Sequence, residues 1–148
     1  MSASKINLSE PPQFLSILGS QGFNFDSVKG IAEMKFKIGK ELTHSNGTIV
    51  QGGFITAMLD ASMAHLLILK GDGKINPLSL NVNVAFLAPG KPGEFIASSQ
   101  IDRLGKSVAF TSATLHQGDL LVATASACLL YTSPSPRDAT LSRMPSSA

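Results

Sequence analysis

The stretch of residues 54–70 constrains the fold more than any other part of the chain. It contains no proline and no glycine, and its alanine, methionine and leucine residues favour a helix. Apolar residues occur nearly all round that helix, which is typical of a helix buried on every side. Gly52-Gly53 precede the stretch, and the turn at residues 71–73 ends it. The sequence therefore predicts one long, buried helix around which the rest of the chain must pack.

Strand-like runs stand on both sides of this helix in the sequence. Residues 31–38 alternate before it and residues 78–86 alternate after it, as half-buried strands do. Three more runs follow at 95–101, 108–115 and 120–127, separated by turn residues. Because short turns join neighbouring antiparallel strands, we expect the four runs after the helix to form a meander. The predicted fold class is α+β, with an antiparallel sheet of about five to six strands wrapped around one long central helix.

A length of 148 residues suits a single domain with short flanking segments. Pro11-Pro12 open a short predicted helix that ends at Gly19, so residues 1–27 are expected to be an N-terminal segment with a short helix. Residues 28–127 are expected to form the domain. Residues 128–148 are rich in proline and serine, which predicts a disordered tail.

That C-terminal segment also resembles translated non-coding sequence. CLLYTSPSPRD at residues 128–138 resembles one reading frame of a transposase adapter used in sequencing libraries. SRMPSSA at residues 142–148 resembles the flow-cell sequence that follows such an adapter, and residues 139–141 would then span a sample index. The resemblance implies that the native C-terminus is missing after about residue 127.

Composition restricts the partners to be expected. A net charge of +2 without a basic stripe gives no argument for nucleic acid. The longest apolar run, residues 58–69, is interrupted by Asp60 and His65 and is shorter than the roughly 18 residues of a membrane span. One cysteine excludes a disulfide framework, and His44, His65 and His116 lack metal-ligand spacing. Because the N-terminus also lacks a secretory pattern, we expect a cytoplasmic protein with no membrane, metal or other cofactor.

Asp60 is the most unusual residue of the predicted helix. It is the only acidic residue between Glu41 and Asp72, and its neighbours are apolar. Burying an unpaired carboxylate is costly, so Asp60 must face solvent, a cleft or a partner. Either it lies on an exposed or interface stripe, or it acts as a general base or nucleophile.

The glycine pair at the start of the helix gives the second interpretation of Asp60 some support. Glycine permits close backbone approach, and the free N–H groups and positive dipole end of a helix favour developing negative charge. Gly53 and Asp60 are seven residues apart, nearly two turns, so they share a face. One helix could then present both an oxyanion donor and a base. On its own, the glycine pair fits a plain loop-to-helix junction at least as well.

The segment HSNGTIVQGGFITAMLDASMA, followed by SLNVNVAFLAP and GKPGEF, resembles the hot-dog-fold acyl-CoA thioesterases of the PaaI-like, phenylacetate-pathway type. The hallmark of that family is approximately N-x-x-G-x-x-H-G-G, six residues, and D. The resemblance covers roughly residues 28–127 in the right order of elements. It implies hydrolysis of an acyl-CoA thioester to a carboxylic acid and free coenzyme A, without a cofactor.

The resemblance also implies roles for individual residues. Asp60 would activate water or attack the carbonyl, and the Gly52 N–H would hold the carbonyl oxygen. Asn46 matches a loop asparagine that positions water or substrate, although its loop is about one residue short, and Ser79 matches a strand residue that assists water. Gln51 stands in place of the usual histidine; it keeps hydrogen-bonding ability but cannot titrate.

Four residues are expected to bind the substrate. Gln51 and Gly53 belong to the helix start, where the thioester is expected. Arg103 and Lys106 flank a turn between two strands and could contact the phosphates of coenzyme A. A solvated turn explains Arg103 and Lys106 equally well.

The resemblance also implies an assembly of several subunits, and two alternative functions remain open. By resemblance, two hot-dog subunits join edge to edge and often pair again, which implies a homodimer or homotetramer with Asp60 from one subunit and Gly52 from another. One alternative is a non-catalytic module that binds acyl-CoA, which Gln51 favours and Asp60 opposes. The other is a hot-dog hydratase or dehydratase, whose catalytic histidine would stand near the place of Gln51.

Overall fold

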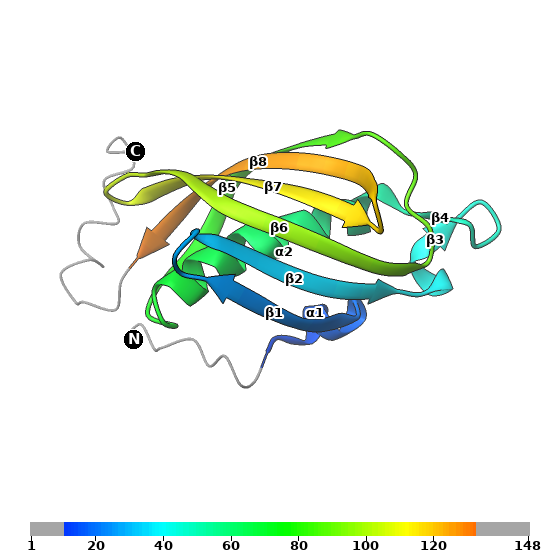
Figure 1. The fold of residues 1–148 in the computed structure, drawn as a ribbon, viewed down its shortest axis with the longest axis horizontal. Helices are drawn as coiled ribbons and strands as arrows, with labels where there is room; N and C mark the ends of the chain where they lie inside the picture. The colour runs from blue at the N-terminus through cyan, green and yellow to red at the C-terminus, as the bar shows by residue number, and fades with distance from the viewer. Residues whose placement is uncertain (1–10, 133–148) are drawn as a thin grey trace.

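The computed structural model describes residues 11–132 (Figure 1). Two helical segments precede the long helix: α1 (Gln13–Ile17) and the 3-10 turn η1 (Lys40–Leu42). The long helix is α2 (Gly52–Lys70). The strands are β1 (Ser20–Asp26), β2 (Ile31–Ile38), β3 (Thr43–His44), β4 (Ile49–Val50), β5 (Asn76–Phe86), β6 (Gly93–Leu104), β7 (Val108–Gln117) and β8 (Leu120–Thr132).

Six of the strands form one antiparallel sheet in the order β1-β2-β6-β7-β8-β5. The sheet curves around α2, and the short β3-β4 ladder lies beside the N-terminal end of that helix (Figure 1). This confirms the predicted α+β architecture, with six strands wrapped around one central helix.

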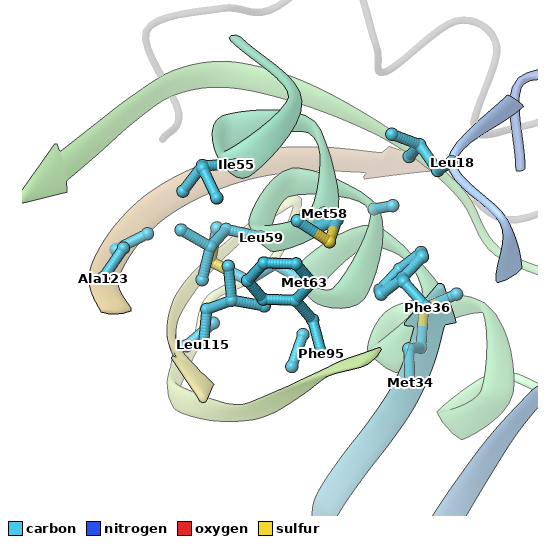
Figure 2. Close-up of a cluster of buried hydrophobic side chains, with 14 of the residues drawn as sticks. Leu18, Met34, Phe36, Ile55, Met58, Leu59, Met63, Phe95, Leu115 and Ala123 are labelled. Carbon is cyan, nitrogen blue, oxygen red and sulfur yellow. The ribbon is translucent and has the colours of Figure 1, made fainter. Parts of the chain in front are cut away.

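The core lies between α2 and the inner face of the sheet. Figure 2 shows α2 side chains surrounded by side chains from the strands, Phe36 of β2 and Phe95 of β6 among them. Met58, Leu59 and Met63 of α2 are fully buried. A helix that the sheet covers on most sides needs apolar residues nearly all round, which is the pattern that predicted its burial.

The apolar content of α2 is also high enough for a membrane span. By length and composition alone, the helix could cross a membrane, contrary to the expectation drawn from the interrupted apolar run of residues 58–69. Length and composition are weak evidence for a membrane span when only one helix qualifies, because the core helix of a globular fold meets the same criteria. More than half of the apolar stretch of α2 is buried inside this fold, so the sheet that wraps around the helix accounts for its composition.

The four-strand meander expected after α2 is wrong for its first strand. β6, β7 and β8 are hydrogen-bonded in succession, but β5 pairs with β8 at the edge of the sheet. The connection between β5 and β6 therefore crosses three strand spacings, roughly 14 Å at about 4.8 Å per strand. Six residues, 87–92, make this connection, and their extended reach of roughly 20 Å is sufficient. A linker of this length fits both a hairpin and a crossover, so its length could not decide between them.

The sheet starts earlier in the chain than the expected domain boundary at residue 28. β1 pairs with β2 from Ser20 to Asp26, inside the segment to which only a short helix was assigned. The short helix itself is confirmed as α1. β1 was missed because most of its side chains are exposed, so its sequence SQGFNFD carries little apolar alternation.

The sheet also continues past residue 127, because β8 extends to Thr132. Leu129 is fully buried and lies between Ala109 of β7 and Ser79 of β5. The expectation of a disordered tail is therefore wrong for residues 128–132. Residues 133–148 lie outside the described part of the chain, and the adapter origin of the segment stays a prediction.

Candidate active site

Asp60 and Ser79 form the polar centre of the candidate site. Asp60 lies half-buried in the middle of α2, and its Oδ1 accepts a hydrogen bond of 2.6 Å from the hydroxyl of Ser79 on β5. β5 is one of the two edge strands, so the carboxylate lies under the margin of the sheet and not under its centre. The position explains how one acid is tolerated on an apolar helix. Within residues 11–132 no hydrogen bond reaches its second oxygen, which is therefore open to a water molecule or a substrate.

A β-bulge turns Ser79 toward Asp60. Strict alternation along residues 78–86 would place Ser79 on the outer face with Asn81 and Asn83. The pairing with β8 shifts between Ser79 and Asn81, which leaves Leu80 as the extra residue. The shift puts Ser79 on the inner face together with Val82, because one inserted residue exchanges the two faces of a strand.

Gln51 caps the N-terminus of α2. Its side-chain Oε1 accepts a hydrogen bond of 2.6 Å from the N–H of Gly53. The Gly53 N–H therefore already has a partner, which argues against its expected role as a substrate contact. The N–H of Gly52, the first helical residue, has no acceptor four residues earlier within the helix, so it suits the expected role of oxyanion donor.

A cavity of about 370 Å³ opens beside Gly52. The other residues that line it are His44, Ile49, Val50, Ile55, Phe86, Leu87, Ala88, Pro89 and Gly90. Its lining is apolar apart from His44 and backbone groups. The N–H of Val50 donates a hydrogen bond of 2.8 Å to the carbonyl of Gly90, and both residues belong to the lining. Such a cavity suits an uncharged organic group next to the Gly52 N–H.

The spacing of Asp60 and Gly52 along α2 argues against both groups acting on one carbonyl within a single chain. Eight residues separate them, which is roughly 12 Å along a helix that rises about 1.5 Å per residue. An oxyanion donor and a base must each lie about 3 Å from the groups they serve. The expectation that one helix presents both groups to one substrate therefore stays a prediction, which this spacing opposes.

Asn46 and its loop only partly match the expectation. Asn46 is exposed in the turn between β3 and β4, where its φ of 61° is left-handed. It does not line the cavity at Gly52, whereas His44 from the same loop does. The structure therefore brings the loop to the helix start but does not bring Asn46 itself against Gly52.

Arg103 and Lys106 lie across the sheet from Ser79. Both are exposed, and one row of paired residues runs from Leu104 to Ser79 through β7 and β8. Three strand spacings amount to roughly 14 Å, so neither cation is adjacent to the Asp60 carboxylate of its own chain. The turn between them is held by the Tyr131 hydroxyl, which donates to the Gly105 carbonyl.

Phe86 belongs to the site, although the sequence pattern gave no indication of this. A Cβ placed on Gly52 would lie 3.4 Å from the Phe86 ring, so the ring forms the wall of the cavity next to the helix start. Its alternation with Val82 and Val84 indicated an inward position, but the crossover that brings residues 86–90 to the start of α2 left no signal. Within residues 11–132, no three His, Cys, Asp or Glu side chains gather where they could hold a metal ion.

Comparison with known proteins places this arrangement in a family. The protein-family model described as the acyl-CoA thioesterase N-terminal domain matches residues 41–130, which is more than half of the chain. A candidate esterase of Thermoplasma volcanium is 30% identical over 80 residues, which cover 54% of this chain and 59% of that protein. The chain therefore spans about three fifths of the length of that relative.

Two solved structures share the fold. A candidate thioesterase of Ralstonia eutropha, described as related to phenylacetic acid degradation, has a TM-score of 0.75 and 28% identity, and the match covers 82% of this chain and 91% of that one. A Bacillus halodurans protein solved with CoA has a TM-score of 0.62 and 18% identity, over 67% and 66% of the two chains. The chain thus belongs to the acyl-CoA thioesterase family, with a hot-dog fold and with PaaI-like, phenylacetate-pathway thioesterases among its structural neighbours.

Proposed function

We propose that the protein hydrolyses an acyl-CoA thioester to a carboxylic acid and free coenzyme A. The hydrogen bond between Ser79 and Asp60 carries the proposal, because it holds an accessible carboxylate on a helix that otherwise serves as core. The apolar cavity beside the Gly52 N–H supplies the second requirement, a place for the acyl group next to an oxyanion donor.

In the proposed reaction, Asp60 acts as a general base. The Ser79 hydroxyl occupies Oδ1 of the carboxylate, so a water molecule binds at the other oxygen and loses its proton there as it attacks the thioester carbon. The Gly52 N–H and the positive end of α2 stabilise the tetrahedral oxyanion. The carbon–sulfur bond then breaks, and the proton held by Asp60 passes to the departing thiolate.

The proposed site is built from two copies of the chain. The spacing of roughly 12 Å along α2 between Asp60 and Gly52 favours a base and an oxyanion donor that come from different subunits. The active species is then at least a homodimer, and a homotetramer would contain two such pairs. We assign Asn46 to the substrate-facing loop, and Arg103 and Lys106 to the phosphates of coenzyme A. The CoA in the Bacillus halodurans structure supports this class of ligand.

Thiol release from a panel of acyl-CoAs tests the proposal. Short-chain, aromatic and long-chain acyl-CoAs are each incubated with the wild-type protein and with Asp60→Asn, and free thiol is measured. The proposal predicts release with at least one class of acyl group and its loss in the variant. No release from any of them would contradict a hydrolase.

Binding without hydrolysis is the second candidate function. It is favoured by Gln51, which cannot titrate and whose carboxamide is already bonded to the Gly53 N–H. A module of this kind would bind acyl-CoA, measured by calorimetry, with equal affinity in the wild type and in Asp60→Asn, and would release no thiol.

A further inference from the structure

The cavity beside Gly52 is lined by one polar side chain, that of His44. Every other residue in its lining is a glycine or carries an apolar side chain. His44 is exposed at the end of β3, so a ligand that enters the cavity can reach its ring. In pockets that are mostly apolar, the few polar groups fix the orientation of the bound molecule. The ring is therefore placed to contact whatever group binds next to the helix start.

Hydrogen bonds fix the loop that carries His44 against the start of α2. The N–H of Gln51 donates to the Leu42 carbonyl at 3.0 Å, and the N–H of Thr48 donates to the His44 carbonyl at 3.2 Å. β3 is paired with β4 at both of its residues. The ring thus extends from a segment that is tied to the residue just before the helix.

The hydroxyl of Ser45 orients the ring of His44. Its Oγ lies 2.9 Å from Nδ1 of the ring, and no other hydrogen bond within residues 11–132 reaches the hydroxyl or the ring. A hydroxyl that donates to Nδ1 leaves the proton of a neutral imidazole on Nε2. Nε2 is then an N–H donor, and it is the ring nitrogen left for a ligand.

Other N–H groups of the cavity lining are already bonded. Those of Leu87 and Ala88 both donate to the Val122 carbonyl, at 2.8 and 3.1 Å. His44 contributes the one side-chain donor among the lining residues, in addition to the backbone N–H of Gly52. A ligand oxygen at the helix start can therefore meet donors from two different elements.

We propose that Nε2–H of His44 donates a hydrogen bond to the thioester carbonyl oxygen, as a second donor beside the Gly52 N–H. The proposal rests on the proposed function, because that function places the carbonyl at Gly52. Negative charge develops on this oxygen as water attacks, and preorganised donors stabilise such charge best where water is excluded. The cavity of about 370 Å³ is near the lower end of the range for small-molecule sites, so one bound group can contact both of its sides.

Two substitutions separate the donor from the shape of the loop. The amide nitrogen of glutamine can take the place of Nε2, whereas that of asparagine corresponds to Nδ1, which faces Ser45. His44→Asn should therefore lower kcat by about 100-fold, the usual loss for one oxyanion donor, and should change KM far less. His44→Gln should keep most of the turnover. His116→Leu is the matched control at a histidine outside the cavity lining and should have no effect.

Two coenzyme A analogues test the contact without turnover. The ketone isostere of butyryl-CoA has a methylene in place of the thioester sulfur and keeps the carbonyl, whereas S-butyl-CoA lacks the carbonyl. In calorimetry, His44→Asn should bind the ketone more weakly than the wild type by roughly 2- to 10-fold, as for the loss of one hydrogen bond. Its affinity for S-butyl-CoA should be unchanged, which also shows that the variant is folded. His44→Gln should bind both analogues as the wild type does.

The outcomes separate this contact from the proposed function. A wild-type kcat in His44→Asn, or equal affinities of the wild type and His44→Asn for the ketone, would overturn the role of His44, and hydrolysis by the wild type would leave the proposed function standing. An equal loss of affinity for both analogues would also contradict a contact with the carbonyl. A wild type that releases no thiol would count against the proposed function, whereas a loss confined to the ketone would still establish the contact of His44.

Discussion

The hydroxyl of Ser79 lies 2.6 Å from Oδ1 of Asp60 and joins the edge strand of the sheet to the middle of the central helix. This contact exists because a β-bulge at Leu80 rotates Ser79 out of the alternation of its strand. A single extra residue therefore decides whether the carboxylate of α2 has a partner.

Replacing Asp60 by Asn should lower thioester hydrolysis by about 100-fold or more, because an amide cannot accept the proton of the attacking water. Ser79→Ala should cause a smaller loss, since the carboxylate remains but is less well oriented. Circular dichroism of both variants should match the wild type, because Asn keeps the shape of Asp60 and its oxygen can still accept from Ser79. Wild-type rates in Asp60→Asn would show that the residue is structural.

Replacing Gln51 by Ala should lower the free energy of unfolding by about 1 kcal/mol, because the Gly53 N–H loses its capping acceptor. Gln51→Glu is the matched control, since its carboxylate can accept the same hydrogen bond and favours the helix N-terminus. Urea denaturation followed by circular dichroism measures both. Equal destabilisation by Ala and Glu would contradict the capping role.

Replacing Leu129 by Ala should destabilise the fold by about 2–5 kcal/mol, the range for truncating a buried leucine. Leu130→Ala is the control, because Leu130 is only partly buried on the other face of β8 and should cost less. Thermal unfolding compares the two. If Leu129→Ala proved no more destabilising than Leu130→Ala, the domain would end before β8 does.

His65 should make the fold less stable in acid. Burial lowers the pKa of His65 below its ordinary value of 6.5, and its hydrogen bond to the Ala61 carbonyl opposes this only in part. The folded chain holds the neutral ring, while the unfolded chain takes up a proton below pH 6.5. The free energy of unfolding should therefore carry no His65 contribution to its slope above pH 6.5 and should fall as the pH decreases from 6.5 toward the folded pKa.

His65→Gln supplies the comparison for this pH dependence. Urea denaturation across the pH range should show a shallower acid loss for His65→Gln than for the wild type. Parallel curves for the two proteins would mean that other groups cause the acid sensitivity.

Replacing Ser62 by Ala should leave the fold equally stable or more stable by up to about 1 kcal/mol. The Ser62 hydroxyl is fully buried and has no hydrogen-bond partner among residues 11–132, so it carries a desolvation cost without a bond to offset it. The backbone carbonyl that accepts from Ser99 is unchanged by the substitution. A clear loss of stability in thermal unfolding would show that the hydroxyl is satisfied by a buried water.

The sequence predicted those parts of the fold that depend on local patterns. The helix Gly52–Lys70 and the strand Ile31–Ile38 follow from composition and alternation, because both elements are buried along a regular face. β1 carried almost no pattern, since an edge strand with exposed side chains buries little. The place of β5 in the sheet depends on a crossover between β5 and β6, which local residues do not encode.

The residues of the candidate site were likewise predictable from the sequence only in part. Asp60 stood out because a single acid in an apolar helix contradicts its surroundings, and Gly52 stood out through its place at the helix start. The separation of the two along the helix was available from the rise per residue, yet their shared face suggested a single site. The inward rotation of Ser79 and the cap formed by Gln51 depend on a bulge and a side-chain rotamer, which the sequence pattern does not show.

Complementation between two inactive variants tests the shared site most directly. Gly52→Pro removes the proposed oxyanion N–H without breaking the helix, because Gly52 is the first helical residue, where proline is favoured, and Gln51 before it is extended with φ −63° and ψ 136°. Asp60→Asn removes the base. When the two variants are unfolded together and refolded as a mixture, half of the dimers are mixed, and each mixed dimer holds one intact site.

The account predicts that each variant alone is inactive and that the mixture recovers up to about a quarter of the wild-type thiol release, as random pairing in a two-fold dimer requires. Differently tagged copies, isolated by two affinity steps, establish that mixed dimers are present. Mixed dimers that remain as inactive as the parent variants would contradict a site composed of Asp60 from one copy and Gly52 from the other.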